Sequence, residues 1–270
     1  MKTRIVTALV LIPLLVLVLI SPAPVVTAAV MAVCVIGLYE FFKAVGISKK
    51  RCLCALGYAA AVVIPLGAYA GGIWDISRLY MPLAYLFMLL VFLVMLTQHK
   101  TVSFSDAAAL IFAVIYIPYF LTHIIYVREA LNGKILIWLV FIGAFLTDSG
   151  AYFAGVFFGR HKLCPEISPK KTVEGAVGGV VCCIAFCVIY ALIINKVFGL
   201  QINIAKMTVF GAVISVISQI GDLSASIIKR RFGIKDYGNI FPGHGGILDR
   251  CDSVILVAPA VYLFITYIGL

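Results

Sequence analysis

The chain has 270 residues, of which 64% are hydrophobic and only 12% are charged, and its formal net charge is +10. Ordinary soluble domains are about half apolar and about a quarter charged, so this composition excludes a soluble globular protein. It predicts an all-α polytopic membrane protein. The positive charge does not indicate nucleic-acid binding, because Lys and Arg in membrane proteins commonly fix the topology. We therefore expect the lipid bilayer as a partner and no nucleic acid.

Nine apolar runs are long enough, or nearly so, to form membrane-spanning helices of roughly 20 residues. In chain order they cover about 5–20, 24–45, 52–71, 79–97, 107–127, 135–158, 174–198, 206–228 and 253–269, with ends uncertain by a few residues. The first run is short and follows Lys2 and Arg4, so a cleaved signal peptide is an alternative to a retained span. A second apolar run follows the short break "SPAP", which favours a retained span and a helical hairpin.

The distribution of Lys and Arg predicts the orientation of the chain. With the N-terminus in the cytoplasm, 16 of the 21 cationic residues fall on the cytoplasmic side, a bias typical of membrane proteins. The exceptions are Arg78, Arg128, Lys134, Lys196 and Lys206. The same arrangement places two polar loops, 159–173 and 229–252, on the cytoplasmic face, and we expect them to form the active site. We expect one continuous membrane domain, with N-terminal transmembrane helices in 1–130 and the polar, functional region in 131–270.

Two aspartates lie where charge is costly. Asp148 follows the run "IWLVFIGAFLT", and Asp222 follows "VFGAVISVISQIG". A carboxylate deep in an apolar span costs at least about 2.5 kcal/mol, so it usually faces a polar cavity and has a partner there. The alternative is a snorkelling or paired carboxylate near a helix end. Glu40 lies close to a predicted span end and is interpreted as structural, with Lys43 three residues later as its partner.

The stretch "SPKKTVEG", residues 168–175, precedes a predicted span. Ser168 or Thr172 can cap the helix that follows, and a helix N-terminus attracts anions. Lys170 and Lys171 add positive charge at the same place. A solvated loop that only fixes topology would also contain lysines, so this reading stays open beside an anion-binding one.

The segment "SIIKRRFGIKDYGNIFPGHGGILDRCDS", residues 226–253, combines cations, aspartates and glycines between two apolar runs. Its cations bind anions, His244 can donate to phosphate, and glycines let backbone N–H groups approach a phosphate closely. Magnesium takes one or two carboxylates together with phosphate oxygens and water. A magnesium–polyphosphate site therefore explains the segment better than a basic patch on anionic lipid. The residues concerned are Lys229, Arg230, Arg231, Lys235, Arg250, Gly243, Gly245, Gly246, Asp222, Asp236, Asp249 and Asp252.

The pattern S-x-x-K-R, four residues, K-D, then P-G-H-G-G-x-x-D-R-x-D resembles the signature of the phosphatidate cytidylyltransferases, also called CDP-diacylglycerol synthases. Here it consists of Ser226, Lys229, Arg230, Lys235, Asp236, Pro242, Gly243, His244, Gly245, Gly246, Asp249, Arg250 and Asp252. The elements "D-x-x-A-Y-x-x-G" from Asp148 and "SPKKTxEG" are similar to the same family. The match is dense over roughly 148–253 and generic before it. Cys251 stands where the family usually has an aliphatic residue, which should affect packing more than chemistry.

The resemblance implies an enzyme of phospholipid biosynthesis in a bacterial-type inner (plasma) membrane. It would transfer CMP from CTP to phosphatidate at the cytoplasmic face, releasing CDP-diacylglycerol and pyrophosphate. Mg²⁺ would be bound by Asp222 and Asp249, with Asp148 or Asp252 in reserve, and His244 would contact the leaving pyrophosphate. A second cation and a homodimer stay open.

The residues that we expect to carry this activity fall into two groups. The candidate catalytic residues are Asp222, Asp249, Lys229, Arg230, His244 and Arg250. The candidate substrate-binding residues are Ser168, Lys170, Lys171, Thr172, Lys235, Asp236, Gly245 and Gly246. Two alternatives remain for the function, a CTP-dependent polyprenol kinase, which would release CDP, and an ion or solute transporter.

Overall fold

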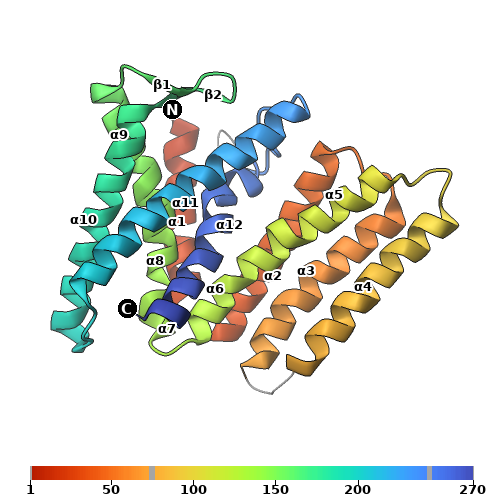
Figure 1. Ribbon diagram of the computed structural model, residues 1–270, viewed down its shortest axis with the longest axis horizontal. Helices are drawn as coiled ribbons and strands as arrows, with labels where there is room; N and C mark the ends of the chain where they lie inside the picture. The colour runs from red at the N-terminus through yellow and green to blue at the C-terminus, as the bar shows by residue number, and fades with distance from the viewer. Residues whose placement is uncertain (1, 73–76, 242–244, 270) are drawn as a thin grey trace. The chain divides into compact units, whose positions relative to one another are not determined.

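The computed structural model describes residues 2–72, 77–241 and 245–269, and these are mostly helical (Figure 1). The first half comprises α1 (Lys2–Ile20), α2 (Ala23–Ala44), α3 (Arg51–Gly71), α4 (Ser77–Thr97), α5 (Phe104–Val114), the π-helical segment η1 (Ile115–Tyr119) and α6 (Phe120–Glu129). The second comprises α7 (Gly133–Leu136), α8 (Trp138–Phe141), η2 (Ile142–Leu146), α9 (Thr147–Phe158), β1 (Lys162–Cys164), β2 (Ser168–Thr172), α10 (Val173–Phe198), α11 (Ile204–Arg231), α12 (Leu248–Leu263) and η3 (Phe264–Ile268).

Within the described ranges, eight helical stretches are long and apolar enough to cross a membrane. They run over residues 23–44, 51–71, 78–97, 104–129, 133–158, 173–198, 204–231 and 248–268, and each matches one predicted span. The remaining predicted span, the first, coincides with α1. The all-α polytopic membrane architecture is therefore confirmed. The side of the membrane on which the N-terminus lies stays a prediction.

The chain forms two compact units. The N-terminal unit contains Met1–Leu131 and Asp236–Arg250, and the C-terminal unit contains Asn132–Lys235 and Cys251–Leu270. The charged segment identified in the sequence is continuous along the chain but contributes residues to both units. Each unit is therefore described separately below.

In the N-terminal unit, α2 packs against α3 and α6, and α3 also packs against α4 and α5 (Figure 1). Helices α2 and α3 meet closely at Gly57, where a Cβ atom would lie 2.5 Å from Cζ of Phe42. Phe42 is fully buried. Helix α4 differs, because its apolar side chains are largely exposed, with Met81 80% and Leu96 73% accessible. Such a helix suits contact with lipid.

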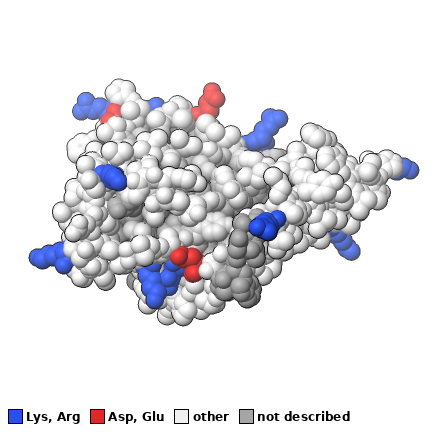
Figure 2. Space-filling view, turned by 60° about the horizontal axis from the view of Figure 1, so that its bottom comes forward, with Lys and Arg blue, Asp and Glu red and all other residues white. Residues whose placement is uncertain are grey.

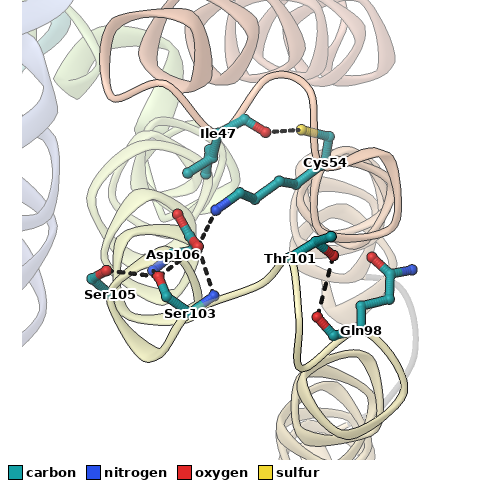
Figure 3. Close-up of polar contacts among 8 residues, drawn as sticks. Ile47, Cys54, Gln98, Thr101, Ser103, Ser105 and Asp106 are labelled. Atoms are coloured by element: carbon teal, nitrogen blue, oxygen red, sulfur yellow. Dashed lines mark hydrogen bonds and ion pairs between the residues drawn. The ribbon is translucent and has the colours of Figure 1, made fainter.

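One polar cluster in this unit caps α5 at its N-terminus (Figure 3). Ser103 accepts a hydrogen bond from the backbone N–H of Asp106, and the Asp106 carboxylate accepts one from the backbone N–H of Ser103 at 2.8 Å. This is a capping box, which satisfies helix-terminal donors from both sides. Lys50, at the start of α3, forms an ion pair with the same carboxylate. The carboxylate that caps α5 therefore also links α5 to the start of α3.

In the C-terminal unit, α9 lies beside α10, and α10 beside α11 (Figure 1). Small residues make this packing close, since a Cβ atom at Gly211 would lie 2.9 Å from Cα of Ile184. The antiparallel hairpin of β1 and β2 connects α9 with α10. Thr172 ends β2 and caps α10, because its Oγ1 accepts from the backbone N–H of Gly175 at 3.1 Å. The predicted helix cap is thus confirmed for Thr172.

Two helices extend further into the charged segment than its apolar pattern predicts. Helix α11 continues to Arg231, so that Lys229 and Arg230 lie on a helix. Helix α12 begins at Leu248, so that Asp249 and Asp252 are helical too. The interpretation of these residues as loop residues is wrong, because hydropathy marks where apolar contact ends and not where helical hydrogen bonding ends. Aspartate in the first turn also suits the helix dipole.

Charge is sparse on the face of the molecule that Figure 2 draws. Figure 2 shows a face that is mostly uncharged, with Lys and Arg in a few separate groups and Asp and Glu in fewer. Such a surface fits a protein whose helices are surrounded by lipid.

Candidate active site

Five charged residues gather in the C-terminal unit, and we call them the acidic–lysine cluster: Asp148 on α9, Lys171 on β2, Asp222 and Lys229 on α11, and Asp252 on α12. Lys171 Nζ forms an ion pair with Asp222 Oδ2. The charges of Asp222, Lys229 and Asp148 all act on the Asp252 carboxylate. The fold therefore brings together residues that the sequence supplies from two distant segments.

Asp148 is positioned by the helix before it and by α12. It lies in the first turn of α9, directly after the π-helical segment η2, and such segments often occur at functional sites. The hydroxyl of Ser253 donates to Asp148 Oδ2 at 3.2 Å, and the backbone N–H of Ser253 donates to Asp252 Oδ1 at 2.9 Å. Ser253 is only 3% exposed. Sequence reasoning missed Ser253, although it directly follows the last aspartate of the charged segment.

Helices α11 and α12 approach each other closely beside the cluster. A Cβ atom at Gly221 would lie 2.9 Å from the carbonyl oxygen of Asp252 and 3.3 Å from Cα of Ser253. Gly221 immediately precedes Asp222. The absence of a side chain at this position therefore lets the two backbones, and with them two of the carboxylates, come together.

The cations of this unit differ in accessibility. Lys229 is 8% exposed, and a buried ammonium group is costly unless opposite charge surrounds it. The side chains of Lys171 and Asp222 are 27% and 24% exposed, so this pair is only partly buried. Lys170 and Lys235 are exposed. The acidic surroundings of Lys229 thus account for its burial, whereas the Lys171–Asp222 pair is partly exposed.

Arg230 has a structural contact beside its predicted role. Its Nε donates to the carbonyl of Ile167 at 3.3 Å, and its Nη1 donates to the carbonyl of Ile234 at 3.1 Å. Ile167 lies between β1 and β2, so Arg230 holds the hairpin to the end of α11. Ser168 opens β2 and is partly buried.

The N-terminal unit contains further candidate residues, and Asp249 is central among them. Asp249 is 5% exposed, and its Oδ2 accepts from the backbone N–H groups of Tyr237, at 2.8 Å, and Gly246, at 3.0 Å. Gly245 has a φ of +84°, which favours glycine. Asp236 and Arg250 are exposed. One oxygen of Asp249 thus holds the backbone on both sides of residues 242–244.

Pro242, Gly243 and His244 lie outside the described residues. The predicted contact of His244 with pyrophosphate therefore stays a prediction, as do the catalytic and ligand roles of the other candidate residues.

Glu40 was interpreted as a structural partner of Lys43, and the structure gives its carboxylate different contacts. The Glu40 side chain, on α2, is 2% exposed. Its Oε1 accepts from the backbone N–H of Ile247 at 3.1 Å, and its Oε2 accepts from that of Leu248 at 2.9 Å. Sequence reasoning missed this contact, because the two partners are 207 and 208 residues away along the chain.

The donor chemistry of the cluster suits magnesium. Among the described residues, no three His, Cys, Asp or Glu side chains are already grouped to hold a metal ion. Magnesium does not require three, because it takes one or two carboxylates and completes its shell with phosphate oxygens and water. The Asp252 carboxylate also lies in the field of two other carboxylates, a repulsion that a cation would relieve. The residues present thus fit a metal ion that binds together with a phosphate ligand.

These features define an integral membrane protein with a polar, carboxylate-rich cluster built from its C-terminal helices. More particularly, the chain belongs to the cytidylyltransferase family, whose family model matches residues 2–268. The resemblance inferred from the charged segment is confirmed.

Several relatives carry the name phosphatidate cytidylyltransferase. The Staphylococcus epidermidis protein is 37% identical over 206 residues, which cover 76% of each chain. The Bacillus subtilis protein is 38% identical over 191 residues, covering 70% of this chain and 69% of the relative. The Thermotoga maritima protein is 33% identical over 184 residues, covering 67% and 68%.

Proposed function

We propose that the chain is a magnesium-dependent phosphatidate cytidylyltransferase, which converts CTP and phosphatidate into CDP-diacylglycerol and pyrophosphate. The observation that carries the proposal is the acidic–lysine cluster, in which Lys171 pairs with Asp222 beside two further aspartates. The names of the relatives support the same activity. Neither a plain topogenic loop nor a lipid-contacting basic patch explains carboxylates gathered in this way.

The reaction requires little proton transfer. An oxygen of the phosphatidate phosphate attacks the α-phosphorus of CTP, a new P–O bond forms, and the bond from the α-phosphorus to the bridging oxygen breaks. Pyrophosphate leaves with that electron pair. Phosphomonoesters have a second pKa of about 6, so the attacking group is largely ionised at neutral pH and needs no strong base. Positioning the two substrates and neutralising their charge should supply most of the rate enhancement.

The residues of the cluster divide naturally between these tasks. Lys171 and Lys229 would neutralise phosphate oxygens, and Lys171 would exchange its contact with Asp222 for one with substrate. Asp222, with Asp148 or Asp252, would hold Mg²⁺, while Asp249 stays a further candidate from the signature. A bound magnesium ion would supply additional charge neutralisation at the phosphates. A second cation is compatible with the number of carboxylates.

The location follows from the substrates and from the charge bias. Phosphatidate is a bilayer lipid and CTP is a soluble cytoplasmic nucleotide, so the site should lie at the cytoplasmic face of the inner membrane. The excess of Lys and Arg in the segments that carry the candidate residues supports this orientation. A homodimer is compatible with the proposal but is not needed for it.

Product analysis tests the proposal directly. The purified protein is incubated in detergent with phosphatidate, Mg²⁺ and CTP labelled at the α-phosphate, and lipid-soluble label is separated from water-soluble label. We expect label in CDP-diacylglycerol and an equal amount of pyrophosphate, with both lost on chelation and restored by Mg²⁺. Label recovered as CDP would instead identify a lipid kinase. Absence of turnover both with several lipid phosphates and with a polyprenol would refute both and favour a transporter.

A further inference from the structure

Glu40 closes the N-terminus of the helix that carries Asp249. The first N–H groups of any helix lack partners within the helix, and in α12 the N–H of Leu248 and that of the preceding Ile247 point to the two oxygens of Glu40. A carboxylate at this place is favoured by the helix dipole as well as by the hydrogen bonds. Glu40 is thus a cap supplied by another helix, α2.

The burial of Glu40 requires both bonds. A carboxylate that is 2% exposed would be costly without compensation, and each of its oxygens accepts a backbone N–H at 2.9–3.1 Å. Removing the charge therefore leaves the two backbone N–H donors with poorer hydrogen-bond acceptors, and it leaves a polar side chain buried without full hydrogen bonding. The contact is specific in geometry and not merely a charge near a helix end.

The surrounding residues are shaped around this carboxyl group. A Cβ atom at Gly238 or Gly246 would run into the Glu40 side chain, so neither position has room for one. The next residue on α2, Phe41, stacks on Tyr237 with ring centroids 6.3 Å apart and an interplanar angle of 26°. The backbone N–H of Tyr237 in turn donates to Asp249. The end of α2 therefore supports the charged segment on both sides of residues 242–244.

We propose that Glu40 is a positioning residue for the reaction. It fixes the start of α12, and with it the backbone that presents Asp249, Arg250 and the two glycines Gly245 and Gly246, without itself touching substrate. The inference rests on the proposed function for its catalytic consequence, but its structural part can be measured independently. It assigns a role in the active site to a helix that the family resemblance left generic.

The chain offers a matched control in Asp106. This carboxylate also caps a helix N-terminus in the N-terminal unit and also accepts a backbone hydrogen bond; in addition it accepts one from the Ser103 hydroxyl and pairs with Lys50. The helix that it caps, α5, carries none of the candidate site residues. Glu40→Gln and Asp106→Asn are both nearly isosteric and both remove one capping charge, so they separate loss of helix capping in general from loss of positioning at α12.

The experiment compares the unsubstituted protein, Glu40→Gln, Glu40→Asp and Asp106→Asn in detergent. Three quantities are measured: CDP-diacylglycerol synthesis with separate KM values for CTP and phosphatidate, the thermal unfolding midpoint, and amide hydrogen exchange of peptides covering Gly245–Arg250. For Glu40→Gln we expect kcat/KM for CTP to fall about 10- to 100-fold, the range found when groups supporting a ligating residue are removed. Exchange at Gly245–Arg250 should accelerate, and Glu40→Asp should recover part of both. Asp106→Asn should change neither.

Several results would overturn the inference. One is unchanged exchange at Gly245–Arg250 together with an unchanged kcat/KM for CTP in Glu40→Gln. Another is a loss of activity in Glu40→Gln that is proportional to the loss of folded protein, with the same proportion in Asp106→Asn. A cap that only stabilises the fold would behave in this way. If the unsubstituted protein made no CDP-diacylglycerol, the proposed function would fail, and hydrogen exchange alone would then decide whether Glu40 positions the start of α12.

Discussion

Replacing Lys171 by Met tests whether the Lys171–Asp222 ion pair serves catalysis or only stability. Both side chains are about a quarter exposed, and ion pairs of this kind contribute only about 0.2–1 kcal/mol to folding. A hydrogen bond from an ammonium group to a substrate phosphate is worth more, about 1.5–3 kcal/mol. We therefore expect Lys171→Met to lower kcat/KM by about 10- to 150-fold, since 1.36 kcal/mol corresponds to a factor of ten. The thermal unfolding midpoint should change by no more than a few degrees.

The double variant decides between the two roles of Lys171. If the lysine only neutralises Asp222, Lys171→Met combined with Asp222→Asn should be more active than either single variant, because both unpaired charges are then gone. If Lys171 binds phosphate and Asp222 holds the metal, the double variant should be at least as impaired as Asp222→Asn alone. Recovery of activity in the double variant, measured as lipid-soluble label from CTP, would refute the proposed exchange of partners.

Three further predictions concern the C-terminal unit and the metal. Gly221→Ala places a methyl group against the backbone of α12, and we expect a destabilisation of about 1–3 kcal/mol, seen in thermal unfolding, together with reduced activity. Thr172→Ala removes the cap of α10 and should cost about 1 kcal/mol, whereas Thr172→Ser should retain most of the stability. Chelation of divalent cations should abolish synthesis, with recovery on adding Mg²⁺ and no change in helix content by circular dichroism; loss of helix content would contradict a purely catalytic role for the metal.

The helices could be predicted from the sequence because the bilayer fixes their length and their composition. An apolar run of suitable length has few alternatives to a spanning helix, and the eight long helices in the described residues follow such runs. Their ends could not be predicted equally well. Lys229 and Asp249 are polar but still helical, because backbone hydrogen bonding and helix capping determine where a helix stops, and hydropathy does not report either one.

The site shows the same limit at the level of side chains. The signature and the lone intramembrane aspartates identified Asp148, Lys171 and Asp222 as candidates, since charge in an apolar chain is conspicuous. The contacts that these side chains make could not be predicted from the sequence. Lys171 reaches Asp222 from the short hairpin that follows α9, and Ser253 reaches Asp148 from α12. Both contacts depend on tertiary structure, and a residue pattern contains no distance between segments.

Glu40 and Asp106 show why one carboxylate cap is visible in a sequence and another is not. A capping box places its hydroxyl and carboxylate three residues apart, so the pair Ser103 and Asp106 can be recognised locally. The cap of α12 comes from another helix, and the nearest local reading for Glu40 was an ion pair with Lys43. That interpretation did not take into account that buried backbone N–H groups need hydrogen-bond acceptors, which any part of the fold can supply. A buried acidic residue far from any signature is therefore best tested against unpaired helix N-termini before it is paired with a neighbouring lysine.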